Sequence, residues 1–209
     1  MLFRSLELRI DYLADVDEQD IKTLASTVKG QKVILTYRAK WEGGQFNGTE
    51  KERITLLKCA LKERFTFVDV ELATLQKNNL HFTKSERSKL LVSYHNFEKT
   101  PSLKSLDAIK KKMLTYNPAV IKIATNVTQQ KDLATLTTFL LETVAEGTKA
   151  IVIGMGEIGA VTRIFFPFIG SEATYASTAK QTASGQLSRE RMLEILATDE
   201  TQMKHGFSN

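Results

Sequence analysis

The sequence predicts an α/β fold in which parallel strands close into a (β/α)8-type barrel. Segments with strand and helix patterns alternate along the 209-residue chain, which is typical of a parallel sheet. No Gly-x-Gly-x-x-Gly follows the first strand, so a dinucleotide-binding fold is not supported. Polar residues recur on one face of successive strands, which favours a barrel interior over an open sheet covered by helices on both faces.

The first half of the chain yields three strands and three helices. Residues 6–11 alternate strictly between apolar and charged side chains and predict a strand. Asp15 or Asp17 caps the helix that follows, and Gly30 ends it. Apolar runs and helical periodicity then predict a strand at 33–38, a helix at 50–64, a strand at 67–72 and one short helix within the weakly patterned segment 73–89.

The second half continues the alternation. A stripe of leucines makes 128–146 the strongest helix prediction, and Gly147 ends it. The other expected elements are strands at 90–95, 117–124, 150–154 and 173–176, helices at 103–116 and around Arg163, and a final helix capped by Ser188. Residues 1–197 are expected to form a single barrel domain, with 198–209 as a C-terminal tail.

Composition narrows the function classes. The chain is 42% hydrophobic and 25% charged, with a net charge of +5, which is ordinary for a globular protein, and no apolar run is long enough to span a membrane. The single Cys59, expected at a buried helix position, cannot form an internal disulfide, which fits a reducing cytoplasm. We interpret the run Lys110-Lys111-Lys112 as a solvated helix face rather than a nucleic-acid patch. The expected partner is a small molecule, without nucleic acid or membrane, and the sequence leaves a homodimer open.

The polar face of the predicted strands carries the candidate site. Charged groups crowded into one interior must pair or bind a ligand, because an unpaired buried charge is costly. The residues concerned are Glu7, Arg9 and Asp11; Thr36 and Arg38; Asp69 and Glu71; Ser93 and His95; and Lys122.

Lys122 is the candidate nucleophile. It lies on the same strand face as Val120 and Ala124, and loss of hydration there is expected to lower the pKa of its amine and free it to attack a carbonyl. The alternative is a lysine on an edge strand that reaches solvent.

With these residues collected, the chain resembles type I 3-dehydroquinate dehydratase of the shikimate pathway, which serves aromatic amino acid and chorismate biosynthesis. The loop 41–45 is similar to forms of that enzyme fused to shikimate dehydrogenase. The matching pieces are Glu7, Arg9 and Asp11; Thr36 and Arg38 with Glu42, Gly43 and Gly44; Asp69 and Glu71; Ser93, His95 and Phe97; Lys122 and Ala124; Met155 and Gly156; Thr162 and Arg163; and Ala183, Gly185 and Gln186.

The resemblance implies a lyase that converts 3-dehydroquinate to 3-dehydroshikimate and water without a metal or organic cofactor. It implies that Lys122 forms an imine with the substrate ketone, that His95 transfers the protons and that Glu71 orients His95. It further implies substrate contacts by Glu7, Arg9, Arg38, Arg163, Thr182 and Gln186.

The chain also departs from the family pattern. The family has a barrel strand and helix before the strand of Glu7, so the barrel is expected to lack its first strand and helix. Thr182 stands in place of a serine, Ser184 in place of a proline and Asn96 in place of an aspartate. Two alternatives stay open: a truncated, inactive barrel remnant and a class I aldolase, which would also use a strand lysine.

Overall fold

The computed structural model describes residues 5–177 and 185–195. The chain forms two compact units. Unit 1 comprises Met1–His95 with Ala108–Lys122, and unit 2 comprises Asn96–Asp107 with Ile123–Asn209. The expected tail at 198–209, Thr182 and Ser184 lie outside the described residues.

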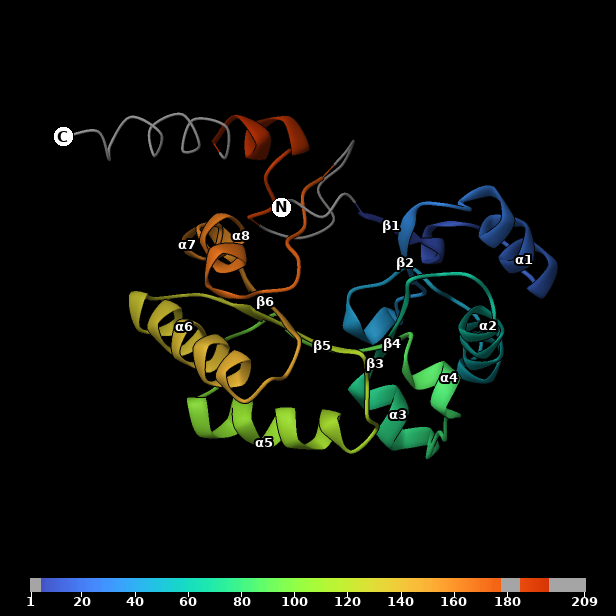
Figure 1. Cartoon of the computed structure of the whole chain (residues 1–209), viewed down its shortest axis with the longest axis horizontal. Coiled ribbons are helices and arrows are strands. Elements are labelled where there is room, and N and C mark those ends of the chain that lie inside the picture. The colour runs from blue at the N-terminus through green and yellow to red at the C-terminus, as the bar shows by residue number, and fades with distance from the viewer. Residues whose placement is uncertain (1–4, 178–184, 196–209) are drawn as a thin grey trace. The chain divides into compact units, whose positions relative to one another are not determined.

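Strands and helices alternate through unit 1 (Figure 1). In chain order they are β1 (Ser5–Arg9), η1 (Ile10–Tyr12), α1 (Glu18–Thr27), β2 (Lys32–Thr36), η2 (Lys40–Glu42), α2 (Glu50–Lys62), β3 (Phe67–Glu71), α3 (Leu72–Asn78), α4 (Lys84–Arg87) and β4 (Leu90–Asn96). The polar segment 73–89 was expected to hold one short helix. It holds most of α3 and the whole of α4.

The strands of unit 1 pair in parallel. Leu8 pairs with Leu35, Leu35 with Val68, and Val68 with Leu90. The Ala119 N–H donates to the Leu90 carbonyl at 2.9 Å, so the chain entering the next strand lies beside β4. Strand order in the sheet follows chain order, which confirms the predicted α/β pattern. In-register parallel pairing brings the polar side chains of neighbouring strands onto one face.

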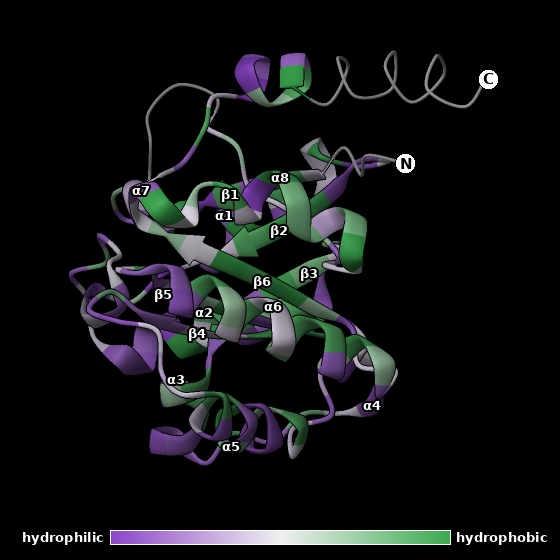
Figure 2. Ribbon diagram, turned by 90° about the vertical axis from the view of Figure 1, so that its left-hand side faces the viewer, coloured by the Kyte–Doolittle hydropathy of each residue, from purple (hydrophilic) through white to green (hydrophobic). Residues whose placement is uncertain are grey.

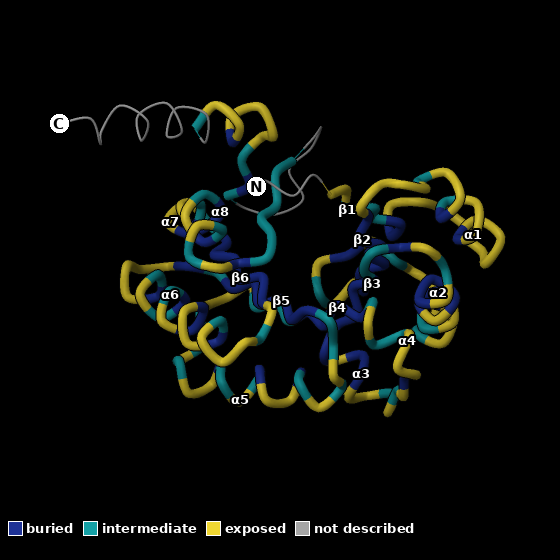
Figure 3. The backbone as a smooth tube through the Cα atoms, in the orientation of Figure 1, coloured by how far each residue is buried: buried dark blue, intermediate teal, exposed yellow. Residues whose placement is uncertain are grey.

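Helix starts in unit 1 follow the expected chemistry. Asp17 caps α1 and Thr49 caps α2, each in a reciprocal capping box with the residue three positions later. The helix α2 packs against both α1 and β3. Cys59 of α2 is buried, as predicted. Figure 3 shows buried strands and helices whose outward turns are exposed.

The last residue of β4 belongs to unit 2, and α5 (Leu103–Leu114) and β5 (Val120–Asn126) are likewise divided between the two units. Unit 2 continues with α6 (Gln130–Ala145), β6 (Ala150–Met155), α7 (Gly156–Gly159), α8 (Thr162–Phe165) and η3 (Phe166–Ile169). The strand β6 is buried throughout and coloured as hydrophobic over most of its length in Figure 2. This is typical of a strand covered on both sides.

The predicted strand at 173–176 is wrong. Those residues take no strand conformation, and only Ser177 forms an isolated bridge, with Ser188. The preceding residues do lie beside β6, because the Glu172 N–H donates to the Ala150 carbonyl at 2.9 Å. The Ser171 hydroxyl accepts from Val152 N–H and donates to the Ala173 carbonyl. A side chain that satisfies backbone groups in this way replaces the regular strand ladder.

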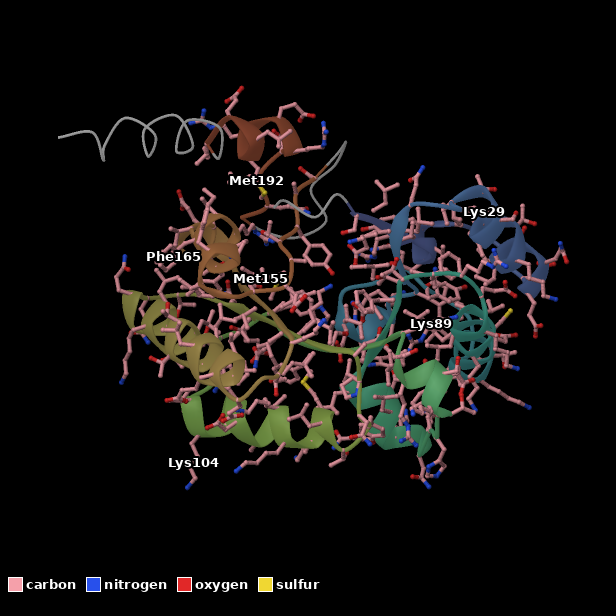
Figure 4. The ribbon with its side chains drawn as sticks, in the orientation of Figure 1. Lys29, Lys89, Lys104, Met155, Phe165 and Met192 are labelled. Atoms are coloured by element: carbon pink, nitrogen blue, oxygen red, sulfur yellow. The ribbon has the colours of Figure 1, made fainter. Side chains whose placement is uncertain are left out.

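The three lysines of α5 do not share one environment. Lys111 and Lys112 are exposed, whereas Lys110 is only 3% exposed. The expected solvated face is therefore wrong for Lys110. Successive residues are rotated by about 100° around a helix, so three in a row cannot face the same way. Lys110 shares a side with the buried Leu106 and Met113, while Lys104 points away from the ribbon in Figure 4.

Among residues 5–177 and 185–195, no helix combines the length and apolarity that crossing a membrane requires.

Candidate active site

The polar face of the strands in unit 1 forms one connected ionic cluster, as the alternation of the sequence predicted. Its members come from five strands, β1 to β5, and from the loop after β2. They are Glu7, Thr36, Arg38, Glu42, Asp69, Glu71, Ser93, His95 and Lys122. The parallel registers make this convergence possible, because equivalent strand positions lie side by side.

Lys122 is buried on β5, with 5% exposure, but its immediate surroundings are not apolar. Its Nζ lies 3.2 Å from Asp69 Oδ2 and 3.6 Å from Glu7 Oε1. The Thr36 hydroxyl donates to the same Glu7 oxygen at 2.9 Å. The burial of Lys122 excludes the alternative of an edge lysine that reaches solvent. The two nearby carboxylates show that its surroundings are not purely apolar.

Arg38 connects the members of the cluster. Its Nη2 donates to Asp69 at 2.7 Å, and its Nη1 donates to the Ser93 hydroxyl at 2.8 Å. The Ser93 hydroxyl in turn donates to Asp69. Burial opposes the ionised form of Asp69, but the charges of Arg38 and then Lys122 outweigh burial and hold the pKa of Asp69 well below its usual range. Asp69 is therefore a fixed negative charge between Arg38 and Lys122.

His95 pairs with a different carboxylate from the one expected. Its Nδ1 lies 2.8 Å from Glu42 Oε2, whereas the contacts of the predicted partner Glu71 are to other groups. Burial lowers the pKa of His95 well below its ordinary value, helped by the charges of Arg38 and Lys122. Burial, followed by the nearby charge of Glu71, raises the pKa of Glu42 to about 8. The pair therefore carries little net charge near neutral pH.

Glu71 is held elsewhere by four groups. One carboxylate oxygen accepts from the Ala39 N–H at 3.1 Å and lies 3.3 Å from Arg38 Nη1. The other accepts from Arg53 Nη1 at 2.9 Å and from the Thr74 hydroxyl at 3.1 Å. These partners fix Glu71 as a structural anchor for the start of the loop that carries Glu42.

That loop turns back sharply because of its glycines. Gly43 ends η2 with a φ of 77°, a conformation that costs little only for glycine. A Cβ on Gly44 would lie 2.0 Å from the carbonyl oxygen of Arg38. The close approach of residue 44 to residue 38 therefore requires glycine, and it folds Glu42 over toward His95.

Arg9 and Asp11 extend the polar face past the end of β1. Arg9 donates twice to the Asp11 carboxylate, at 2.8 and 2.7 Å, and Asp11 also accepts from the Gln45 N–H at 3.1 Å. Asp11 and Tyr37 line a cleft of about 950 Å³ in unit 1, outside the Lys122 environment. The Asp11 contact thus joins the loop of Glu42 to η1, which directly follows β1.

Unit 2 holds the remaining predicted residues. Arg163 of α8 is 2% exposed, and its Nε donates to the Gly185 carbonyl at 3.0 Å. Burial lowers the pKa of its guanidinium to about 10. Gln186, next to Gly185, is also buried. The structure thus brings Arg163 to the segment of Gln186, while Thr182 lies outside the described residues.

Several residues of the cluster had no assigned role in the sequence, and two of them contact a predicted catalytic group. Glu42 follows Arg38 by four positions and precedes two glycines, and this spacing is the signal that points to it. Asp69 shares its strand face with Glu71, two positions away, and this alternation is the corresponding signal. The buried Arg53 comes from α2 and carries no strand signal at all.

The arrangement supplies a buried amine, a histidine–carboxylic acid pair and several fixed charges. An amine of this kind suits attack on a carbonyl, and a histidine with a carboxyl partner suits proton transfer. Within the described part of the chain, no group of three or more His, Cys, Asp or Glu side chains is placed to hold a metal ion.

Comparisons with known proteins agree on one family. Residues 3–203 match the type I 3-dehydroquinase family. The chain is 37% identical over 195 residues to the 3-dehydroquinate dehydratase of Methanocaldococcus jannaschii, covering 91% of this chain and 84% of the relative. A 3-dehydroquinate dehydratase of Coxiella burnetii is 32% identical, with coverages of 91% and 80%.

Solved structures show the same fold. The 3-dehydroquinate dehydratase from Aquifex aeolicus superposes with a TM-score of 0.76 at 30% identity, covering 91% of this chain and 85% of that one. The enzyme from Geobacillus kaustophilus gives a TM-score of 0.78 at 24% identity, with coverages of 97% and 81%. These likenesses confirm the predicted barrel type of α/β fold.

Proposed function

The chain belongs to the type I 3-dehydroquinase family, whose reaction in the shikimate pathway is the dehydration of 3-dehydroquinate, and we propose that it performs this reaction through an imine on Lys122. The amine attacks the ketone carbon and releases water to form the imine. The imine then accepts the electrons that proton removal leaves on the neighbouring carbon. Loss of the hydroxyl gives the conjugated product, and hydrolysis of the imine returns Lys122.

His95 moves the protons in this scheme. It removes the proton next to the imine and later donates a proton to the departing hydroxyl, so one residue serves as base and then as acid. Ionised Glu42 accepts from Nδ1–H, which gives Nε2 the lone pair that a base needs. A protonated Glu42 instead donates to Nδ1 and leaves the ring hydrogen on Nε2. The reactive form therefore needs Glu42 ionised.

Charged side chains hold the substrate. Arg38 and Arg163 bind its carboxylate and nearby oxygens, for which a guanidinium fork is well suited. Glu7 and Arg9 contact the ring hydroxyls. Gln186 and Thr182 complete the proposed set of substrate contacts. Glu71 acts through its anchoring of the loop rather than through contact with His95.

The observation that supports the proposal most strongly is the joining of a buried strand lysine to a histidine–carboxyl pair through Arg38 and Asp69. Family membership favours the dehydratase over the class I aldolase. We place the reaction in the cytoplasm, where the lone Cys59 stays reduced.

The proposal is tested by assay and by trapping. With 3-dehydroquinate, the chain should generate the absorbance of a conjugated enone. Borohydride added with substrate should attach the mass of the reduced ligand to the peptide that contains Lys122. Lys122→Arg should abolish both signals, because a guanidinium stays protonated. Lys104→Arg, at an exposed lysine of α5, is the matched control and should change neither.

Three outcomes distinguish the proposed mechanism from its alternatives. Trapping at another lysine would contradict the assignment of Lys122. A chain that neither turns over substrate nor forms a trapped imine would support the inactive remnant. His95→Ala should still trap ligand on Lys122 but turn over at least about 10²-fold more slowly, the usual lower contribution of a general acid–base group.

A further inference from the structure

The guanidinium of Arg53 lies fully buried beneath the loop that carries Glu42. Arg53 is on α2 and has 0% exposure. Its Nε and Nη2 donate to the two oxygens of Glu50, at 2.8 and 2.7 Å, and Nη2 also donates to the Thr74 hydroxyl. Its Nη1 donates to the Tyr37 carbonyl at 2.6 Å and to Glu71 at 2.9 Å. All five N–H donors of the side chain are therefore used.

Two of these bonds hold the chain on either side of Arg38. Arg53 binds the Tyr37 carbonyl directly and binds Glu71, whose other oxygen accepts from the Ala39 N–H at 3.1 Å. The backbone before and after Arg38 is thus fixed by one ion pair. Arg38 is the residue that connects Asp69 and Ser93.

The fixed segment leads straight into the turn of Glu42. Ala39 is the N-cap of η2, and its carbonyl accepts from the N–H groups of Glu42 and Gly44, both at 3.0 Å. Any displacement of Ala39 therefore moves Glu42, whose carboxyl meets His95 at 2.8 Å. Trp41, between them, lies with its ring 5.5 Å from the Arg53 guanidinium.

We infer that Arg53 is a positioning residue of the dehydration: through Tyr37, Glu71 and Ala39 it places the Glu42 carboxyl against His95. This inference rests on the proposed roles of Glu42 and His95. A buried ion pair is weak evidence for a contribution to stability alone, since apolar groups of similar volume often serve as well. The Arg53 side chain instead donates to groups on α2, on α3, just after β2 and at the end of β3. One side chain that connects four parts of the chain fits a geometric role.

Charge and geometry can be separated by substitution. Arg53→Lys keeps the positive charge but has a single nitrogen that cannot reach all these acceptors at once. Arg53→Met removes the charge as well. The Arg53 charge also lowers the pKa of Glu42, so its removal should raise that pKa further. Arg64→Lys and Arg64→Met, at an exposed position beyond the end of α2, are the matched controls.

The experiment measures kcat, KM and the pH profile, with active sites counted by borohydride trapping on Lys122. We expect Arg53→Lys to lower kcat per trapped site by about 10- to 100-fold, a fraction of the full contribution of a general base. Its KM should stay within about threefold of the wild-type value. In the pH–rate profile of Arg53→Lys, the rise in rate on the acid side should keep its position. In the profile of Arg53→Met, that rise should move to higher pH. Emission from Trp41, the single tryptophan, should change in both variants and in neither control.

Each outcome decides the inference. If Arg53→Lys keeps the wild-type kcat per trapped site and pH profile, with only a lower Tm, Arg53 is merely structural and the inference is wrong. If Arg53→Met does not fold, Arg53→Lys alone decides by the same criteria. If neither folds, Thr74→Val removes one Arg53 contact, and wild-type kcat in that variant with unchanged Trp41 emission overturns the inference. A wild-type chain without turnover would instead contradict the proposed function, so the two failures are distinguishable.

Discussion

At the residue scale, the central feature is the contact of Glu42 Oε2 with His95 Nδ1 at 2.8 Å. The pKa of Glu42 is raised to about 8, mainly by burial, and that of His95 is lowered well below its usual value, also mainly by burial. Both shifts disfavour charge in the same place. The pair is therefore poised to carry one proton between two sites without a net charge on the pair.

The pH dependence of turnover follows from Glu42. Because the reactive form needs an ionised Glu42, kcat/KM should rise with pH and level off above about pH 8. Glu42→Gln should lose that ionisation and lower kcat at least about tenfold, since a neutral amide cannot stabilise the charged imidazole that forms during proton removal. Steady-state rates between pH 6 and 10 measure both effects.

A matched carboxylate provides the control for this prediction. Glu63→Gln, at the end of α2, should leave the rate and the pH profile unchanged. If kcat/KM of Glu42→Gln still rose with pH in the same range, a group other than Glu42 would control that rise.

At the scale of elements, the decisive feature is the loop between β2 and α2. Its start is held by Glu71 and Arg53, its turn by Gly43 and Gly44, and its end by the N-cap Thr49. The Gln45 N–H donates to Asp11 at 3.1 Å, which attaches the middle of the loop to η1, directly after β1. A loop fixed at this many points can hold a carboxyl within hydrogen-bond distance of His95.

Gly44→Ala tests that geometry. The added methyl would lie 2.0 Å from the Arg38 carbonyl oxygen, so backbone must move and carry Glu42 away from His95. We expect kcat to fall at least about tenfold, the lower part of the range for acid–base catalysis, while borohydride still traps ligand on Lys122. Rates and trapping yields are measured on the same preparation.

Gly147→Ala is the control for that change. Gly147 has a φ of 79° but no neighbouring atom within 4 Å of an added Cβ. It should cost about 1–2 kcal/mol of unfolding free energy, the penalty for a left-handed residue with a side chain, and leave kcat unchanged. Full activity in Gly44→Ala would mean that the close approach of the loop to Arg38 is not needed for catalysis.

At the scale of the whole molecule, the charged cluster makes stability depend on pH in both directions. The lowered pKa of Asp69 contributes stability above the unfolded value of 3.8, and this is lost as pH falls below it. The lowered pKa of His95 likewise favours folding as pH rises through 6.5. The raised pKa of Glu42 has the opposite sign: stability is lost as pH rises from 4.5 to about 8.

The sum predicts a plateau with a decline on each side. Between pH 4.5 and 6.5 the contributions of Glu42 and His95 oppose each other, because the native state binds one proton more at Glu42 and one fewer at His95. From pH 6.5 to 8 the free energy of unfolding should fall by up to about 1.4 kcal/mol per pH unit, the slope for one proton. Urea unfolding at pH 3 to 9 measures the curve.

Two variants assign the limbs of that curve. Glu42→Gln should flatten the decline above pH 6.5. Asp69→Asn should flatten the acid decline while lowering stability overall, since it removes the carboxylate that pairs with both Arg38 and Lys122. A decline above pH 6.5 that persists in Glu42→Gln would contradict the assignment to Glu42.

The sequence by itself determined the alternation of strands and helices, the polar strand face and the place of Lys122 on that face. These follow from local periodicity, because a strand sends alternate side chains to opposite faces whatever its neighbours are. Many of the residues that carry the resemblance to the family lie on this polar strand face. Only the tertiary structure decided that Glu42, and not Glu71, meets His95. Spacing assigns a side chain to a face but not to a partner, and Glu71 is drawn away by Arg53, which comes from a helix with no strand signal. The missing strand at 173–176 has a similar cause, since the Ser171 side chain satisfies the backbone groups that a strand ladder would have used.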